Sequence, residues 1–174
     1  QGTIEFFKLI AQKYDRSLEF TVQIRLEAAE DSELLETMKQ AGVKYVCIGF
    51  ESPVDKELEA MRKGYSSEDM IRWAKTFHRF GFFIHGMFIF GYPLKKDSEQ
   101  SDISAQERVK LFKKFIRRCR LDTVQVLRPV PLAGTGLRGR LEKEGKLFPL
   151  KQVPWEFYDD NFACFMPDNM TLEE

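Results

Sequence analysis

Two side chains of opposite charge stand near the ends of neighbouring predicted strands, where they could bind a polar ligand. Glu51 follows a mostly apolar run at 43–50, and Arg25 lies on the polar face of an alternating segment at 19–26. A guanidinium can hold a carboxylate through two parallel hydrogen bonds, and a carboxylate can accept them from hydroxyl or ammonium groups. Ligands of parallel α/β proteins bind at the carboxyl ends of strands. The sequence therefore predicts a ligand site at this edge of a sheet.

Each of these residues also has a purely structural interpretation. Glu51 could cap the short helix predicted after Pro53 by accepting hydrogen bonds from its first N–H groups. Arg25 could form an internal salt bridge with Glu51 or with Glu27. From the residues alone, both interpretations stay open beside the ligand site.

The remaining reactive side chains give weaker signals. Lys63 precedes Gly64 at the end of a short predicted helix, where the helix dipole alone would explain a lysine. His85 lies alone on a predicted strand, and a single histidine there is more often a packed core residue than a ligand. The three cysteines, Cys47, Cys119 and Cys164, are too far apart for metal-ligand spacing, so no metal site is predicted.

The composition is that of a globular protein rather than of a membrane protein. The chain has 174 residues, of which 43% are hydrophobic and 31% charged, with 27 basic and 27 acidic side chains. No apolar run approaches the roughly 18 residues of a membrane span. The balanced charge favours neither nucleic acid nor an anionic membrane, and the basic run at 113–118 is typical of a solvated helix face. We expect one cytoplasmic domain.

Strands and helices are predicted to alternate along the chain. The strands are expected at 19–26, 43–50, 82–90 and 123–127. Helices are expected at 3–14, after Asp31 or Ser32, after Pro53, after Ser66 or Ser67, after Ser104 and after Gly136. Such alternation is typical of repeated right-handed βα units around a parallel sheet, so the fold class is α/β.

Six segments, taken in order, resemble one known family. The segment 34–52 ends in Ile-Gly-Phe-Glu-Ser, and 86–93 reads Gly-Met-Phe-Ile-Phe-Gly-Tyr-Pro. The other four are 22–26, 58–64, 122–145 and 155–170. Together they resemble the radical S-adenosylmethionine (radical SAM) superfamily, and within it the cobalamin-domain-associated branch that includes the anaerobic magnesium-protoporphyrin cyclase.

One hallmark of that family is absent from these 174 residues. The resemblance leads one to expect a CxxxCxxC loop that ligates a [4Fe-4S] cluster, and Cys47, Cys119 and Cys164 cannot replace it, because ligands of one cluster need close spacing. The chain is then expected to be the last four βα units of a partial (β/α)6 TIM-like barrel at 1–146, followed by an irregular tail at 147–174. Its first partner would be the missing N-terminal part of the same protein.

The resemblance also implies an activity for the parent enzyme. The cluster would cleave S-adenosylmethionine reductively, giving a 5′-deoxyadenosyl radical that abstracts hydrogen from a substrate that the sequence does not identify. S-adenosylmethionine and the [4Fe-4S] cluster are the implied cofactors, and cobalamin is left open as a third. This chain alone is expected to be inactive and to hold no cofactor by itself.

The resemblance assigns roles to five residues of this chain. Arg25 would approach the carboxylate end of S-adenosylmethionine, and Glu51 would contact its ribose or amino group. Lys63 would act as a supporting charge, and the backbone and side chains of Met87 and Phe88 would lie against the adenine.

A different class of function is the alternative. The chain could be a non-catalytic module that binds a partner protein through its open sheet edge and its Phe-rich interior. An unpaired strand edge associates readily with other chains, so we expect self-association through residues 20–26 in either case.

Overall fold

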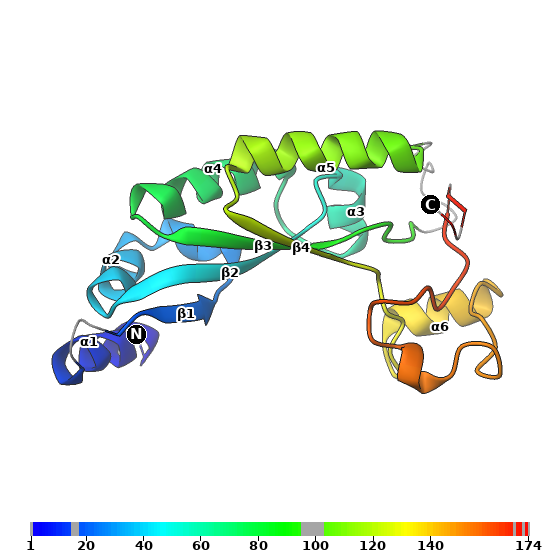
Figure 1. Ribbon diagram of the computed structural model, residues 1–174, viewed down its shortest axis with the longest axis horizontal. Helices are drawn as coiled ribbons and strands as arrows, with labels where there is room; N and C mark the ends of the chain where they lie inside the picture. Colours follow the sequence, from blue (N-terminus) through cyan, green and yellow to red (C-terminus); the bar gives the residue numbers. More distant parts are fainter. Residues whose placement is uncertain (1, 15–17, 95–102, 169, 172, 174) are drawn as a thin grey trace.

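Four parallel strands pair in the order in which they occur along the chain (Figure 1). The computed structural model describes residues 2–14, 18–94, 103–168, 170–171 and 173. The strands are β1 (Phe20–Gln23), β2 (Val43–Glu51), β3 (Phe83–Ile89) and β4 (Thr123–Leu127). β2 and β3 are central, and β1 and β4 form the two edges. The predicted α/β class with a parallel sheet is confirmed.

Helices connect the strands, and most of them begin at a side-chain cap. They are α1 (Gly2–Lys13), α2 (Ser32–Gln40), α3 (Asp55–Ala60), α4 (Ser67–Arg79), α5 (Ala105–Cys119) and α6 (Gly136–Lys143), with 3-10 turns η1 (Leu26–Glu30) and η2 (Trp155–Phe157). Asp31 accepts a hydrogen bond from the Leu34 N–H at the start of α2. Ser66 and Ser104 form complete capping boxes at α4 and α5, because each is followed three residues later by an acidic side chain.

The two faces of the sheet differ in what covers them. Val46, Ile48 and Phe50 of β2 are fully buried, and Figure 1 shows α4 and α5 lying along this face. Successive strand residues point to opposite faces, so Cys47 and Glu51 belong to the other side, where the alternating strand residues are only half-buried. In the described part of the chain no helix covers this second face. The inner face of a barrel is likewise free of helices.

The first strand is shorter than its alternating pattern predicts, and this corrects the expected position of Arg25. Pairing ends at Gln23, and the backbone turns into η1. Leu26 and Ala29 are buried in the core beneath α4, and the Trp73 indole donates a hydrogen bond to Glu30. Because Leu26 packs into the core, the backbone leaves the sheet before Arg25. Arg25 therefore lies just beyond the strand rather than on its polar face.

A buried ion pair lies behind the carboxyl end of β2. The carboxylate of Glu57, on α3, pairs with the guanidinium of Arg108, on α5, and the Ser52 hydroxyl donates to the same carboxylate. Glu57 is 0% and Arg108 4% exposed. The Ser52 hydroxyl also accepts a hydrogen bond from the Val54 N–H. This cluster joins α5 to the turn that follows Glu51.

The last helix and the tail stand at the end of the sheet toward which the strands run (Figure 1). The tail folds back on itself through an antiparallel bridge between Leu147 and Phe165. Arg128, just after β4, donates a hydrogen bond to the carbonyl of Asn161. The boundary between a barrel at 1–146 and a tail at 147–174 stays a prediction.

In the part of the chain that the structure describes, no helix combines the length and the hydrophobicity that a membrane crossing requires.

Candidate functional site

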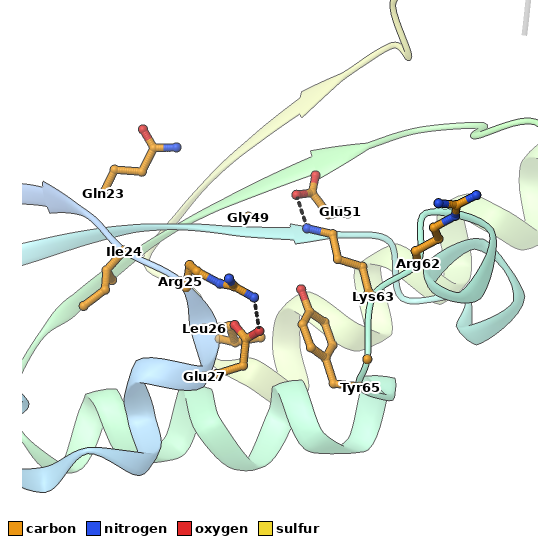
Figure 2. Close-up of a pocket in the computed structure, with 11 residues that line it drawn as sticks. Gln23, Ile24, Arg25, Leu26, Glu27, Gly49, Glu51, Arg62, Lys63 and Tyr65 are labelled. Atoms are coloured by element: carbon orange, nitrogen blue, oxygen red, sulfur yellow. Dashed lines mark hydrogen bonds and ion pairs between the residues drawn. The ribbon is translucent and has the colours of Figure 1, made fainter. Parts of the chain in front are cut away.

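A pocket of about 430 Å³ opens at the carboxyl edge of the sheet (Figure 2). Its walls come from the residues that follow β1, from the end of β2 and from the turn after α3. They are Gln23, Ile24, Arg25, Leu26, Glu27, Gly49, Glu51, Arg62, Lys63, Gly64 and Tyr65. The volume lies within the range of about 300–1,000 Å³ that is typical of small-molecule sites. Three residues predicted to bind a cofactor, Arg25, Glu51 and Lys63, therefore line one pocket.

Glu51 and Lys63 form an ion pair inside this pocket. The Lys63 Nζ lies 2.9 Å from Glu51 Oε1, and the two side chains are 31% and 22% exposed. Figure 2 shows the lysine reaching back across the pocket to the carboxylate at the strand end. The predicted helix cap is therefore not the role of Glu51, because its carboxylate pairs with Lys63 and the Val54 N–H bonds to Ser52 instead.

The backbone at the end of β2 is built to turn Glu51 into the pocket. Glu51 has a φ of 64°, in the left-handed region that side chains other than glycine rarely adopt. The pairing with β3 shifts register between Gly49 and Glu51, as a bulge does. A Cβ atom at position 49 would lie 2.7 Å from Glu51 Oε1, so any larger residue there would displace the carboxylate from its present position. Such strained positions cluster at functional sites.

The ion pair with Glu51 stabilises the charged form of Lys63. Burial by itself would lower the pKa of the Lys63 ammonium, but the hydrogen bond and charge of Glu51 outweigh it, so this pKa lies above its ordinary value. Burial raises the pKa of the Tyr65 hydroxyl, and the neighbouring Lys63 only partly offsets the effect. At neutral pH Lys63 is therefore an ammonium and Tyr65 a neutral phenol, side by side in the pocket.

Arg25 faces the same pocket with a different partner. Its Nη2 lies 2.7 Å from Glu27 Oε1, which confirms the structural alternative of a salt bridge to Glu27 rather than to Glu51. The Arg25 side chain is 86% exposed, so the guanidinium keeps most of its surface free for a ligand. The hydrogen bond to Glu27 raises the pKa of Arg25. Burial tends to raise the pKa of Glu27, but Arg25 reverses this and holds it below the usual range.

The two residues predicted against an adenine lie on opposite faces of β3. Met87 faces the open side of the sheet, in register with Gly49, although it does not itself line the pocket. The Phe88 side chain is 1% exposed and stacks on Phe50, 5.6 Å away between ring centroids, in the helix-covered core. The expected contact of this side chain with a ligand is therefore wrong, and only the backbone of Phe88 remains available.

The other reactive groups lie away from this pocket. His85 Nδ1 is 2.8 Å from the Thr123 hydroxyl of the next strand. Cys119 and Cys164 are buried and Cys47 is half-buried, and none is in a disulfide. Among the described residues, no three histidine, cysteine or acidic side chains are grouped as metal ligands.

Three ionisable side chains of the pocket escaped the sequence analysis as site residues: Glu27, Arg62 and Tyr65. Tyr65 follows Lys63 by two positions in the sequence. This proximity was the signal that could have identified Tyr65 as a residue of the site. Arg62 has a φ of 59° just after α3, in the left-handed region. Nothing in the local sequence predicts that conformation.

Comparison with known proteins identifies the class to which this fold and pocket belong. The sequence model of the radical SAM superfamily matches residues 2–122, and the chain belongs to that superfamily. An uncharacterized methyltransferase of Pyrococcus horikoshii is 29% identical over 107 residues, which make up 62% of this chain and 21% of that protein.

Solved structures share the fold. Elp3 of the archaeon Methanocaldococcus infernus superposes with a TM-score of 0.60 at 19% identity, over 88% of this chain and 34% of that one. The radical S-adenosylmethionine methyltransferase TsrM of Kitasatospora setae, with tryptophan and a SAM analogue bound, gives 0.53 at 16% identity over 71% and 23%. TsrM has also been solved with cobalamin and a [4Fe-4S] cluster. The present chain spans about a fifth to a third of the length of these proteins.

Proposed function

We propose that this chain forms one wall of the S-adenosylmethionine site of a radical SAM enzyme. The observation that carries the proposal is the Glu51–Lys63 ion pair, held at a strand end inside a pocket of about 430 Å³. Membership of the superfamily supplies the class of cofactor. The alternative of a non-catalytic partner-binding module gains no support from the comparisons.

The residues of the pocket fit S-adenosylmethionine in charge. The amino-acid end of that molecule carries a carboxylate and an ammonium, and its ribose carries two hydroxyls. Arg25 offers an exposed guanidinium to the carboxylate, and Glu51 offers a carboxylate to the ammonium or to the ribose hydroxyls. Lys63 holds Glu51 in position through their hydrogen bond. Met87 and the backbone of Phe88 would border the adenine.

The cluster requires ligands from outside these residues. The sequence contains no CxxxCxxC motif, and its three cysteines lie on separate elements. We therefore propose that a [4Fe-4S] cluster is held by another part of the same protein, facing the open side of this sheet. Together with S-adenosylmethionine such a cluster supplies radical initiation. The present residues would bind and orient S-adenosylmethionine and exclude water from it.

Within the superfamily we place the chain in the cobalamin-associated branch. TsrM, which binds cobalamin, shares its fold, and the sequence resembles the branch that contains the anaerobic magnesium-protoporphyrin cyclase. Loss of methyl transfer or cyclisation on removal of cobalamin from the whole protein would support this placement. Full activity without cobalamin would contradict it.

Binding of S-adenosylhomocysteine to this chain tests the proposal. We expect weak but saturable binding by isothermal titration calorimetry, and also binding of methionine alone, because Arg25 and Glu51 face its two charged groups. Glu51→Gln should weaken both affinities by about tenfold or more, since it removes a charged hydrogen-bond acceptor. Lys63→Met should have a similar effect, because it leaves Glu51 without its partner.

A matched control separates local from general effects of charge. Glu59→Gln removes the same charge from an exposed position of α3 that does not line the pocket, and it should leave binding within about twofold. Equal losses for Glu51→Gln and Glu59→Gln would contradict the assignment. Absence of any binding of methionine or S-adenosylhomocysteine would overturn it.

A further inference from the structure

A second pocket adjoins the first. It has a volume of about 300 Å³ and lies between the end of α3 and the start of α6. Its lining residues are Ala60, Met61, Arg62, Tyr92, Gly136, Leu137 and Arg140. Arg62 lines both pockets, so the second one opens beside the proposed cofactor site. Figure 2 shows Arg62 beyond Lys63, directed away from Arg25 and Glu27.

The polar side chains of this second pocket are hydrogen-bond donors that find few acceptors among the described residues. Arg62 is exposed and forms no side-chain hydrogen bond or ion pair with any described residue. Arg140 donates from Nη2 to the carbonyl of Pro93 at 2.8 Å, but its Nη1 is buried without a partner among the described residues. The Tyr92 hydroxyl is likewise unpaired in that part of the chain. A buried guanidinium nitrogen without an acceptor is costly, and its presence calls for a ligand.

None of the described residues that line the pocket is acidic, so none of them balances these charges. Two guanidinium groups without a carboxylate therefore make its potential positive, and arginine binds carboxylate and phosphate oxygens through paired hydrogen bonds. The first two residues of α6 also face the pocket, and the start of a helix adds to the attraction for an anion. Ala60, Met61 and Leu137 supply an apolar wall. The ligand that fits is an anionic group attached to an apolar body.

We propose that Arg62, Arg140 and Tyr92 form a subsite that binds the carboxylate or phosphate group of the substrate. The assignment to a substrate rests on the proposed function, because it is the neighbouring S-adenosylmethionine site that makes this pocket a place for a reacting molecule. Arg62, which lines both pockets, would lie between the two ligands. The substrate class is thus an anionic, partly apolar small molecule.

The test is a titration of the isotope-labelled chain, followed by the amide signals of its NMR spectrum. Three probes of similar shape are compared at fixed ionic strength: benzoate, phenyl phosphate and neutral benzamide. We expect saturable shifts at Arg62, Gly136 and Leu137 with one or both anions and none with benzamide. The anion that binds with the higher affinity identifies whether the pocket prefers carboxylate or phosphate.

Variants decide whether the arginines are responsible. Arg140→Met, which lines only the second pocket, should weaken anion binding by about tenfold or more, and Arg140→Lys should restore part of the affinity. Arg62→Gln serves in the same way if Arg140→Met fails to give a dispersed spectrum. Arg117→Gln removes the same charge from an exposed site of α5 and should leave binding within about twofold.

The outcomes separate this inference from the proposed function. Equal binding of benzamide, equal losses for Arg117→Gln and Arg140→Met, or no saturable shift with either anion would overturn the anion subsite. Binding of S-adenosylhomocysteine to the same sample in that case would leave the proposed function standing. Anion binding without S-adenosylhomocysteine binding would support an anion site here and remove its assignment to a substrate.

Discussion

The buried ion pair between Glu57 and Arg108 gives the sharpest prediction of stability. Both side chains lie almost wholly out of water, and besides Arg108 the Glu57 carboxylate has the Ser52 hydroxyl as a partner. Arg108→Met keeps an unbranched side chain of comparable length and removes the charge. The variant therefore leaves a buried carboxylate without its cation.

The magnitude follows from this burial. Removing one partner of a buried pair costs about 3–5 kcal/mol, because the remaining charge stays desolvated. The free energy of unfolding of an ordinary domain is about 5–15 kcal/mol, so the variant would lose about a fifth of it or more. At roughly 2–4 °C per kcal/mol for a chain of this size, the midpoint of thermal unfolding should fall by about 6–20 °C.

Urea denaturation followed by far-ultraviolet circular dichroism measures the loss. Arg117→Met, on the exposed side of the same helix, is the control and should change the free energy of unfolding by no more than about 0.5 kcal/mol. The double variant Glu57→Leu/Arg108→Met removes both charges and should recover much of the loss. A cost below about 1 kcal/mol for Arg108→Met, or a double variant as unstable as the single one, would refute the reasoning.

Two further predictions concern backbone strain and thiol ionisation. Gly42→Ala should destabilise the chain by on the order of 2 kcal/mol in the same denaturation assay, because φ is +91° and the new Cβ would lie 2.6 Å from the Leu18 carbonyl oxygen. Burial raises the pKa of Cys119 to about 12, so iodoacetamide at pH 8 should label Cys47 and spare Cys119 until the chain unfolds. For the same reason stability should fall as the pH rises from about 9 towards 12, since only the unfolded thiol ionises there.

Local patterns in the sequence predict most of the elements. Asp31, Ser66 and Ser104 mark the starts of three helices, because a cap is a hydrogen bond between residues two or three apart and needs no distant partner. The apolar run of β2 likewise marks a buried strand. The end of β1 could not be predicted, because Leu26 leaves the sheet for a core contact that only the packing of α4 creates.

The site was predicted in part, for a similar reason. The sequence places Glu51 and Lys63 at the ends of their elements, but their pairing depends on the left-handed backbone at Glu51, which no pattern of residue types indicates. The error at Phe88 could have been avoided. Met87 and Phe88 are adjacent in a strand, so their side chains must face opposite sides of the sheet and cannot both contact one ligand.

The identity between strand order and chain order has a consequence for synthesis on the ribosome. Each of β2, β3 and β4 pairs with the strand made just before it, so none of these three must wait for a partner that has not yet been translated. Chains emerge at about 5–20 residues per second, and contacts between near neighbours in sequence form ahead of distant ones. This sheet can therefore be assembled one strand at a time as the polypeptide leaves the exit tunnel, with each new strand pairing at the edge left by the one before it.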